Sequence, residues 1–367
     1  MAKLTWVLYN SNASVDFTSS VQSFTYTQGR QSVLDNYAGG TAQITMRNNN
    51  GQVAGAFLAY RQKVLIKCEG TEVFIGWVQG IDYNDTPGNA NDATAIITLG
   101  DAWVLAGQQI ATSQVLTSND YQVDEIAALQ FYPSQFVQGT ASTSIRGSLT
   151  FAGDWATRLN EIVASDRGRF LTIVGKYVYA PFNRIQNYYA FYNFARTPTA
   201  SAIGYQSLDR VKAIGNQTYV NSAQVTPESL ATQTATNATA LVVGTSAITV
   251  ASLNTTVTDG LNTATWIANS MGDDATQESY QITVKDISQT AVANLADMIA
   301  TTWNLNLDYK PPGGVLTSER TLTEGITVRG FIDHTEVDFY LSPYTYYNYF
   351  ILDDQFNGVL DSSRLGW

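Results

Sequence analysis

Apolar and polar residues alternate in strand-length runs along the first part of the chain, up to about Leu105. Successive side chains of a strand point to opposite faces, so a period of two predicts strands with one buried face. Asn48 to Gly51 predicts a hairpin connection, because Asn and Gly tolerate positive φ. The alternating runs cover residues 23–27, 41–46, 63–67, 72–78 and 94–99. Their spacing predicts an antiparallel β-barrel or sandwich.

Beyond residue 108 the apolar positions change to a helical period. Residues 123–129 predict a short helix. Residues 154–165 predict a stronger one, in which an aspartate caps the start and apolar side chains share one face. Residues 170–174 and 176–179 flank a glycine and predict a hairpin. The middle of the chain is therefore predicted to be α+β.

Strand patterns return after residues 226–239, a segment poor in apolar residues that predicts a surface loop or linker. Residues 289–303 predict a helix with an apolar face. Residues 326–332 and 336–341 predict a closing hairpin, and an aromatic tail follows. No repeat of fixed period is visible, which argues against a solenoid.

The length and these patterns predict more than one domain. The chain has 367 residues, and single cores usually divide beyond about 250 to 300 residues. We predict an N-terminal β-domain over residues 1–107, an α+β middle domain over 108–200, and a C-terminal β-domain with one helix over 201–367. The fold class predicted is mainly β with an α+β middle and two or three helices.

Composition limits the binding partners of the protein. Charged residues make up 14% of the chain, below the roughly 25% of typical soluble domains, and the polar uncharged surface suits large protein contacts. The net charge of −11 argues against a surface that binds nucleic acid phosphates, although ordinary solubility explains the same charge. One cysteine, Cys68, excludes an internal disulfide, and a single histidine excludes a Cys/His zinc cluster.

The start of the chain lacks the long apolar core of a signal peptide, and no stretch approaches the roughly 18 apolar residues of a membrane span. We expect the protein to be made and kept in a cytoplasm until it is assembled or released.

Candidate catalytic residues are few. The pairs Asp273–Asp274 and Asp353–Asp354 are adjacent in sequence, which does not make two carboxylates converge on one bond. His334 lies at a predicted hairpin tip and would need a nucleophile from elsewhere to act as a general base. No nucleophile elbow, phosphate-binding loop or calcium loop occurs in the sequence. We therefore predict no enzyme activity, no cofactor and no metal site.

The many tyrosines allow two interpretations. Exposed rings stack on sugars in carbohydrate-binding proteins, and they anchor protein interfaces at low entropy cost. We favour the interface, formed by packing of the tail after Leu341 on a neighbouring subunit or tail protein. The candidate interface residues are Tyr344, Tyr346, Tyr347, Tyr349, Phe350 and Trp367.

Phrases spread along the chain resemble minor tail proteins of long-tailed bacteriophages. The amino-terminal phrase comprises Asp16–Thr18, Val21–Phe24, Gly29–Arg30, Leu34–Asp35, Ala38–Ala42, Arg47–Asn48 and Gly51. The middle resembles the same family in a helix followed by a short hairpin. The closing phrases comprise Leu295–Ile299, Val328–His334 and Tyr349–Gly366.

This resemblance implies a baseplate or tail-tip hub, similar in fold to the trimeric hubs of contractile-tailed phages, with two tail-tube-like β-domains in each subunit. It also implies a virion location. The implied partners are further copies of the chain, the tail tube or distal tail protein, the central spike or tip protein, the tape measure protein, and double-stranded DNA as a transient passenger. A hexameric distal tail ring and a carbohydrate-binding adhesin module remain alternatives. An acidic lumen would repel passing DNA.

Overall fold

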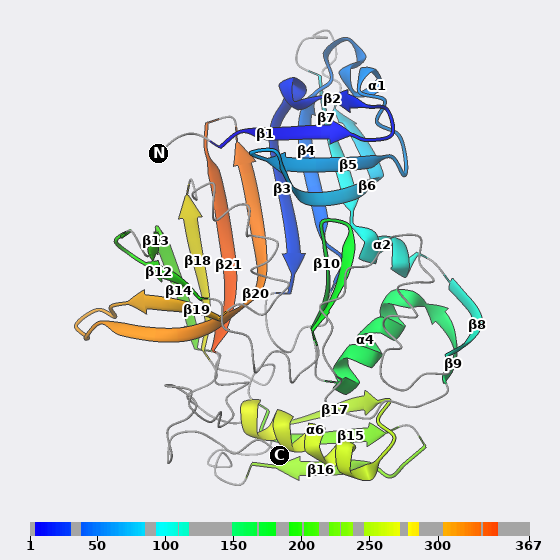
Figure 1. Ribbon diagram of the computed structural model, residues 1–367, viewed down its shortest axis with the longest axis vertical. Coiled ribbons are helices and arrows are strands. Elements are labelled where there is room, and N and C mark those ends of the chain that lie inside the picture. Colours follow the sequence, from blue (N-terminus) through cyan, green and yellow to red (C-terminus); the bar gives the residue numbers. More distant parts are fainter. Residues whose placement is uncertain are drawn as a thin grey trace.

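The computed structural model describes most of the chain (Figure 1). The described residues are 4–30, 38–84, 93–108, 110–116, 149–166, 169–180, 191–199, 202–212, 220–227, 229–237, 246–271, 278–285, 304–331 and 333–343. The helices predicted over 123–129 and 289–303 lie outside these residues. The structure is mainly β, as predicted.

The first β-unit is a two-layer sandwich. It consists of β1 (Trp6–Asn10), β3 (Val21–Gly29), β4 (Thr41–Arg47), β5 (Lys63–Cys68), β6 (Thr71–Asn84) and β7 (Thr94–Gly100). These strands lie in the order β3-β4-β7-β6-β5-β1, and all neighbours are antiparallel. The short strand β2 (Val15–Asp16) extends the edge at β1, and the helices α1 (Gln52–Gly55) and α2 (Ala102–Gly107) flank the unit. The predicted strands of this region are confirmed. The hairpin predicted at Asn48 to Gly51 is wrong, because these residues lead into α1, and β4 pairs with β3 and β7 and not with β5.

One long strand belongs to both layers of the first unit. The start of β6 pairs with β5 and its end pairs with β7, and a bulge between Val78 and Gly80 separates the two parts. A bulge bends a strand and increases its twist, so the chain passes from one layer to the other without a loop. We call β3, β4, β7 and the end of β6 the first layer, and the start of β6, β5 and β1 the second layer.

The second β-unit contains strands from the middle and the end of the chain. It consists of β12 (Phe191–Ala195), β13 (Ala202–Gly204), β14 (Ser207–Lys212), β18 (Glu278–Lys285), β19 (Asn304–Tyr309), β20 (Thr317–Phe331) and β21 (Thr335–Pro343). Their order is β14-β18-β21-β20-β19-β12-β13. Here β20 is the long strand, with its bulge between Thr323 and Gly325.

The two units have the same strand order. In sequence order, β1, β3, β4, β5, β6 and β7 correspond to β12, β14, β18, β19, β20 and β21, and each strand keeps its neighbours. The bulges place Leu99 opposite Val78 and Leu341 opposite Thr323, and Ile97 and Phe339 are buried two residues earlier. One pairing differs, since β12 runs parallel to β19 whereas β1 runs antiparallel to β5. The chain thus contains one β-unit twice, a duplication that no sequence repeat reveals.

The two units are joined edge to edge. β3 at the edge of the first unit pairs antiparallel with the end of β20 in the second (Figure 1). The first layer of the first unit thus continues into the first layer of the second unit, which consists of β14, β18, β21 and the end of β20. The predicted domain boundaries at residues 107 and 200 stay a prediction.

The middle region carries the predicted helix and hairpin. Its elements are β8 (Ile110–Leu116), β9 (Leu149–Asp154), α4 (Trp155–Asp166), β10 (Arg169–Ile173) and β11 (Lys176–Ala180). Asp154 caps α4 as expected, because its Oδ1 accepts from the Thr157 amide at 2.8 Å. The hairpin of β10 and β11 lies against the first unit, where β10 contacts β3 and β6.

A small sheet lies beyond α4 and is covered by a helix (Figure 1). It consists of β15 (Ser222–Pro227), β16 (Gln233–Thr236) and β17 (Ala247–Ser252), with α6 (Val257–Met271) on one face. Part of the loop predicted over 226–239 is therefore a strand, because alternating β-branched Thr residues suit an exposed edge. The helix α6 was not predicted from the sequence, because it is rich in Asn, Thr and Ser, all modest helix formers. Ala264, Ile267 and Ala268 pack this helix on the sheet.

No helix among the described residues has the length and apolar content needed to cross a bilayer.

Candidate functional site

The residues predicted to form an interface, Tyr344, Tyr346, Tyr347, Tyr349, Phe350 and Trp367, lie outside the described residues. The pairs Asp273–Asp274 and Asp353–Asp354 lie outside them as well. That interface stays a prediction. Among the described side chains, no group of three or more His, Cys, Asp or Glu residues is arranged to hold a metal ion.

His334 lies at the tip of the β20–β21 hairpin, as predicted. Its carbonyl accepts from the Phe331 amide at 2.9 Å, and its ring stacks on the Phe331 ring with centroids 4.6 Å apart. The Nδ1 atom lies 2.7 Å from Oδ1 of Asp333, a hydrogen bond that lowers the pKa of this carboxyl group. These contacts orient the imidazole within the hairpin.

The junction of the two β-units contains a buried ion pair. Nε of Arg30 lies 2.8 Å from Oε2 of Glu324, and the Glu324 side chain is fully buried. Glu324 Oε1 accepts from the Ser342 hydroxyl at 2.6 Å, and the Glu324 carbonyl accepts from the Arg30 amide at 2.9 Å. Because an unpaired buried charge is costly, this pair holds the two units in one register.

Glycines allow the backbones to approach closely at this junction. Gly29 has φ +83°, and a Cβ atom there would lie 2.3 Å from the Glu324 carbonyl oxygen. Opposite it, a Cβ atom on Gly325 would lie 2.6 Å from the Arg30 carbonyl oxygen. The Gly29–Arg30 phrase is thus a structural feature of the junction between the units.

The second unit also closes the open end of the first. Each sandwich is open where the edge strand of its first layer faces its second layer, and we call this opening its mouth. The edge strand is β3 in the first unit and β14 in the second. In the first unit, Trp6 packs edge-on against Phe24 with centroids 4.9 Å apart, and its Nε1 donates to the Thr335 hydroxyl at 2.8 Å. The Phe24 ring lies against Gly330, where a Cβ atom would come within 2.1 Å of it.

The glycine pair Gly39–Gly40 of the amino-terminal phrase packs against the buried Asp101. The Gly40 amide donates to Oδ2 of Asp101 at 2.8 Å, and Thr172 also donates to this oxygen. Oδ1 of Asp101 caps α2 by accepting from the amides of Trp103 and Val104. Burial raises the pKa of Asp101 to about 6, and these hydrogen bonds oppose the increase.

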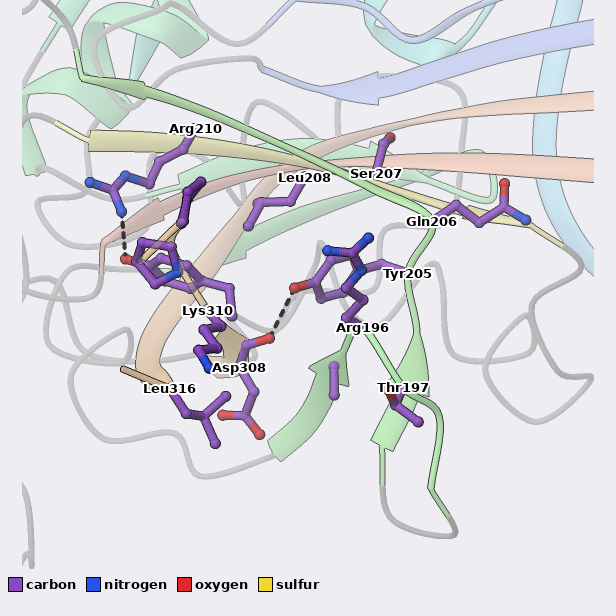
Figure 2. Close-up of a pocket in the computed structure, with 14 residues that line it drawn as sticks. Arg196, Thr197, Tyr205, Gln206, Ser207, Leu208, Arg210, Asp308, Lys310 and Leu316 are labelled. Carbon is purple, nitrogen blue, oxygen red and sulfur yellow. Dashed lines mark hydrogen bonds between the residues drawn. The ribbon is translucent and has the colours of Figure 1, made fainter. Parts of the chain in front are cut away.

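A pocket of about 770 Å³ occupies the mouth of the second unit (Figure 2). It is lined by Ala195, Arg196, Thr197, Tyr205, Gln206, Ser207, Leu208, Arg210, Asp308, Tyr309, Lys310, Pro311, Pro312 and Leu316. These residues come from β12, β14, β19 and their connections, so the pocket lies at the position that Trp6, Thr335 and Gly330 fill in the first unit.

Hydrogen bonds fix the tyrosines of the pocket. Tyr205 donates from its hydroxyl to the Asp308 carbonyl at 3.0 Å, and Arg210 donates to the Tyr309 hydroxyl at 3.2 Å (Figure 2). The Arg210 guanidinium also lies 5.4 Å from the centroid of the Tyr309 ring. Burial raises the pKa of both tyrosines, and Glu319 adds to the increase for Tyr309. Neutral hydroxyls and cationic side chains suit binding by hydrogen bonds and packing.

Neither the buried ion pair nor the pocket could be predicted from local sequence patterns. Gly29–Arg30 stood out in the sequence only as part of the amino-terminal phrase, and nothing marked Glu324 as the partner of Arg30, since these two residues are 294 positions apart. Glu324 lies in β20 within a run of buried residues from Thr321 to Val328, and the only local signal is a charged residue in a strand-like run that is otherwise uncharged from Thr321 to Val328.

Comparison with known proteins by sequence finds no matching family model and no matching curated protein. Solved structures do match. The tail protein from Neisseria meningitidis MC58 has a TM-score of 0.62 and 10% identity, over 93% of this chain and 97% of that chain. The 43 kDa tail protein of prophage MuSo2 from Shewanella oneidensis has a TM-score of 0.58 and 12% identity, over 94% of this chain and 98% of that chain. This chain has the tail-protein fold.

A component of the Escherichia coli type VI secretion system also shares the tail-protein fold, with a TM-score of 0.52 and 10% identity. The match covers 94% of this chain and 77% of that chain, which is described as structurally similar to the T4 bacteriophage tail proteins gp27 and gp5. The predicted resemblance to tail proteins is thus confirmed at the level of the fold. In this tail-protein fold, the buried ion pair lies where the two β-units meet, and the pocket lies at the opposite edge of the second unit.

Proposed function

We propose that the protein is a structural component of a phage tail, a baseplate or tail-tip hub. Three copies form a ring that connects the tail tube or distal tail protein to the central spike or tip protein. The bore of the ring admits the tape measure protein and lets double-stranded DNA pass.

The observation that carries this proposal is the repeated β-unit. Two units with one strand order, joined edge to edge, are what a three-membered ring needs to present six similar units to a six-fold tube. The tail-protein fold supports the assignment to a tail.

The face of the continuous sheet opposite the core is the proposed lining of the bore. Thr25, Thr27, Gln43 and Thr98 alternate there with buried apolar residues. Its charges have both signs, and Arg329 contacts Glu336 and Asp338 at 3.3 and 2.8 Å. We propose that the ion pairs of Arg329 limit the adhesion of DNA phosphates to this face. The acidic lumen suggested by the net charge stays a prediction.

The test is the mass and symmetry of the assembled protein. Light scattering of the purified chain should give three times the chain mass of 40.0 kDa, and electron microscopy of the particle should place a ring at the tail tip. A mass six times that of the chain would favour the hexameric distal tail ring. Glycan binding by a monomer would favour the adhesin module.

The aromatic tail provides a separate test of assembly. Deletion of residues 343–367 should abolish the oligomer in size-exclusion chromatography if the tail packs on a neighbouring subunit. An unchanged oligomer would contradict that role.

A further inference from the structure

The end of β6 in the first unit and the end of β20 in the second are equivalent sheet edges, but only the end of β20 is covered by another described strand. Alignment on the bulges makes Tyr83 at the end of β6 equivalent to Val328 in β20. The Tyr83 side chain lies on the core face beside Ala95 and is 57% exposed, whereas Val328 is 0% exposed. Val328 is covered because β3 lies next to it, with Tyr26 as its partner in the register.

The glycines that follow the two bulges, Gly325 in β20 and Gly80 in β6, show the same difference in how closely other residues approach. A Cβ atom on Gly325 would meet the backbone of β3 and Arg30 within 2.9 Å, but a Cβ atom on Gly80 would meet nothing within 4 Å. The end of β6 therefore presents the same edge as β20, and among the described residues no strand covers it as β3 covers β20.

β14 is the complementary edge. It is equivalent to β3, and the sheet order ends at β14 in the described part of the chain. Leu208 and Arg210 take the positions of Phe24 and Tyr26, which are almost completely buried between the first unit and β20 of the second. Leu208 is half-buried and Arg210 is exposed. The pocket lies directly beside this strand.

We propose that the end of β6 in one copy pairs antiparallel with β14 of a second copy and covers its pocket, as β20 pairs with β3 inside the chain. The in-chain register carries over residue by residue, so that Tyr83 lies opposite Arg210 and Asn84 lies opposite Asp209. The Tyr83 ring then lies at the mouth of the second unit, where arginine and tyrosine side chains offer stacking and hydrogen-bond partners.

This interface rests on the proposed ring, since it closes the continuous sheet from copy to copy. Unpaired edge strands are templates for pairing with another chain, and pairing removes the exposed backbone groups of both edges.

Disulfide trapping tests the register. Arg30 and Glu324 are a hydrogen-bonded pair, because the Arg30 amide donates to the Glu324 carbonyl. Opposite residues in an antiparallel ladder alternate between hydrogen-bonded and non-hydrogen-bonded pairs. Thr25 and Arg329 are therefore a non-hydrogen-bonded pair, in which the side chains come close. Asn84 and Asp209 are the equivalent pair, and both are exposed. The double variant Asn84→Cys with Asp209→Cys should form covalent oligomers on a non-reducing gel, and the native Cys68 is buried.

The matched control is Asn84→Cys with Gln206→Cys, which is out of register by roughly 10 Å and should give at most a tenth of the crosslinked product. Equal crosslinking in both variants would overturn the inferred register. A threefold mass without crosslinks at Asn84 and Asp209 would overturn the interface and leave the proposed ring intact. Crosslinks in a sixfold assembly would support the interface and contradict the trimer.

A substitution without cysteines tests the role of Tyr83. Tyr83→Ala should weaken self-association at least about tenfold in sedimentation velocity, as expected for a buried aromatic anchor. Tyr60→Ala is the control, because Tyr60 is similarly exposed, at 61%, and belongs to neither β6 nor β14. Far-ultraviolet circular dichroism should be unchanged in both variants. Equal association of the two variants would overturn the placement of Tyr83 in the interface.

Discussion

The two β-units show how one strand order acquires different roles from its surroundings. In the first unit, the edge strand β3 and the mouth are covered by the second unit, through Gly330, Thr335 and the pairing with β20. In the second unit, the corresponding edge β14 and mouth form an open pocket. Equivalent positions are therefore buried in one unit and exposed in the other, because burial depends on the neighbour as well as on the strand.

The chemistry at the bulges follows this difference. Glu324 is buried and pairs with Arg30, whereas the equivalent Gln79 is half-buried and accepts from Gln108 at 2.7 Å. A charged pair at the internal junction fixes one register within the chain. A neutral amide at the other bulge leaves that edge without a buried charge.

The largest expected effect is at the ion pair. Arg30→Met removes the guanidinium from a buried carboxylate and should lower the free energy of unfolding by about 4 kcal/mol, measured by urea denaturation. Gln79→Met, at the equivalent position, should cost less than about 1 kcal/mol. Adding Glu324→Leu to Arg30→Met should recover most of the loss. Equal losses at the two bulges would show that the junction does not depend on the ion pair.

Alanine substitutions at the equivalent glycines Gly325 and Gly80 should change the free energy of unfolding by amounts that differ almost as strongly. Gly325→Ala places a methyl group against backbone atoms that cannot rotate away, which should cost about 3 kcal/mol of unfolding free energy. Gly80→Ala enters open space and should change stability by less than about 0.5 kcal/mol. Thermal unfolding of both variants measures the comparison. A neutral Gly325→Ala would mean that β3 and β20 lie farther apart than described.

Asp101 should make the stability of the first unit depend on pH. The equivalent position in the second unit is Pro343, which does not titrate. The pKa of Asp101 is raised to about 6 in the folded protein, so its neutral form stabilises the fold. This contribution is complete below about pH 4 and is lost as the pH rises to about 6. Relative to Asp101→Asn, the wild-type protein should lose about 2 kcal/mol across this window. A pH-independent difference in urea titrations would contradict the raised pKa.

The smallest expected effect concerns charges on the polar face. Arg329→Asn removes contacts with Glu336 and Asp338 and should cost about 1 kcal/mol at low salt. In the first unit, Lys67→Asn removes one exposed pair with Glu72, 3.4 Å away, and should cost about half as much. Both differences should shrink in 1 M salt, as measured by denaturant unfolding. A loss that does not depend on salt would assign Arg329 a packing role.

Local patterns predicted the elements whose side chains follow one period. The alternating runs of the first unit and the capped helix after Asp154 were correctly predicted, because their buried faces are visible in the sequence. The helix α6 and the strand β16 were missed, since Thr and Asn suit loops, strands and helix ends alike and only packing on the small sheet decides between them.

The sequence by itself determined the mainly β fold class, the polar uncharged surface and the Gly29–Arg30 and Gly39–Gly40 phrases as distinctive features. Tertiary structure alone decided the duplication, the partner of Arg30 and the open pocket beside β14. The physical reason is that strand order and edge pairing are contacts between residues far apart in sequence. Such contacts are selected by shape and burial, and they leave no period in the chain.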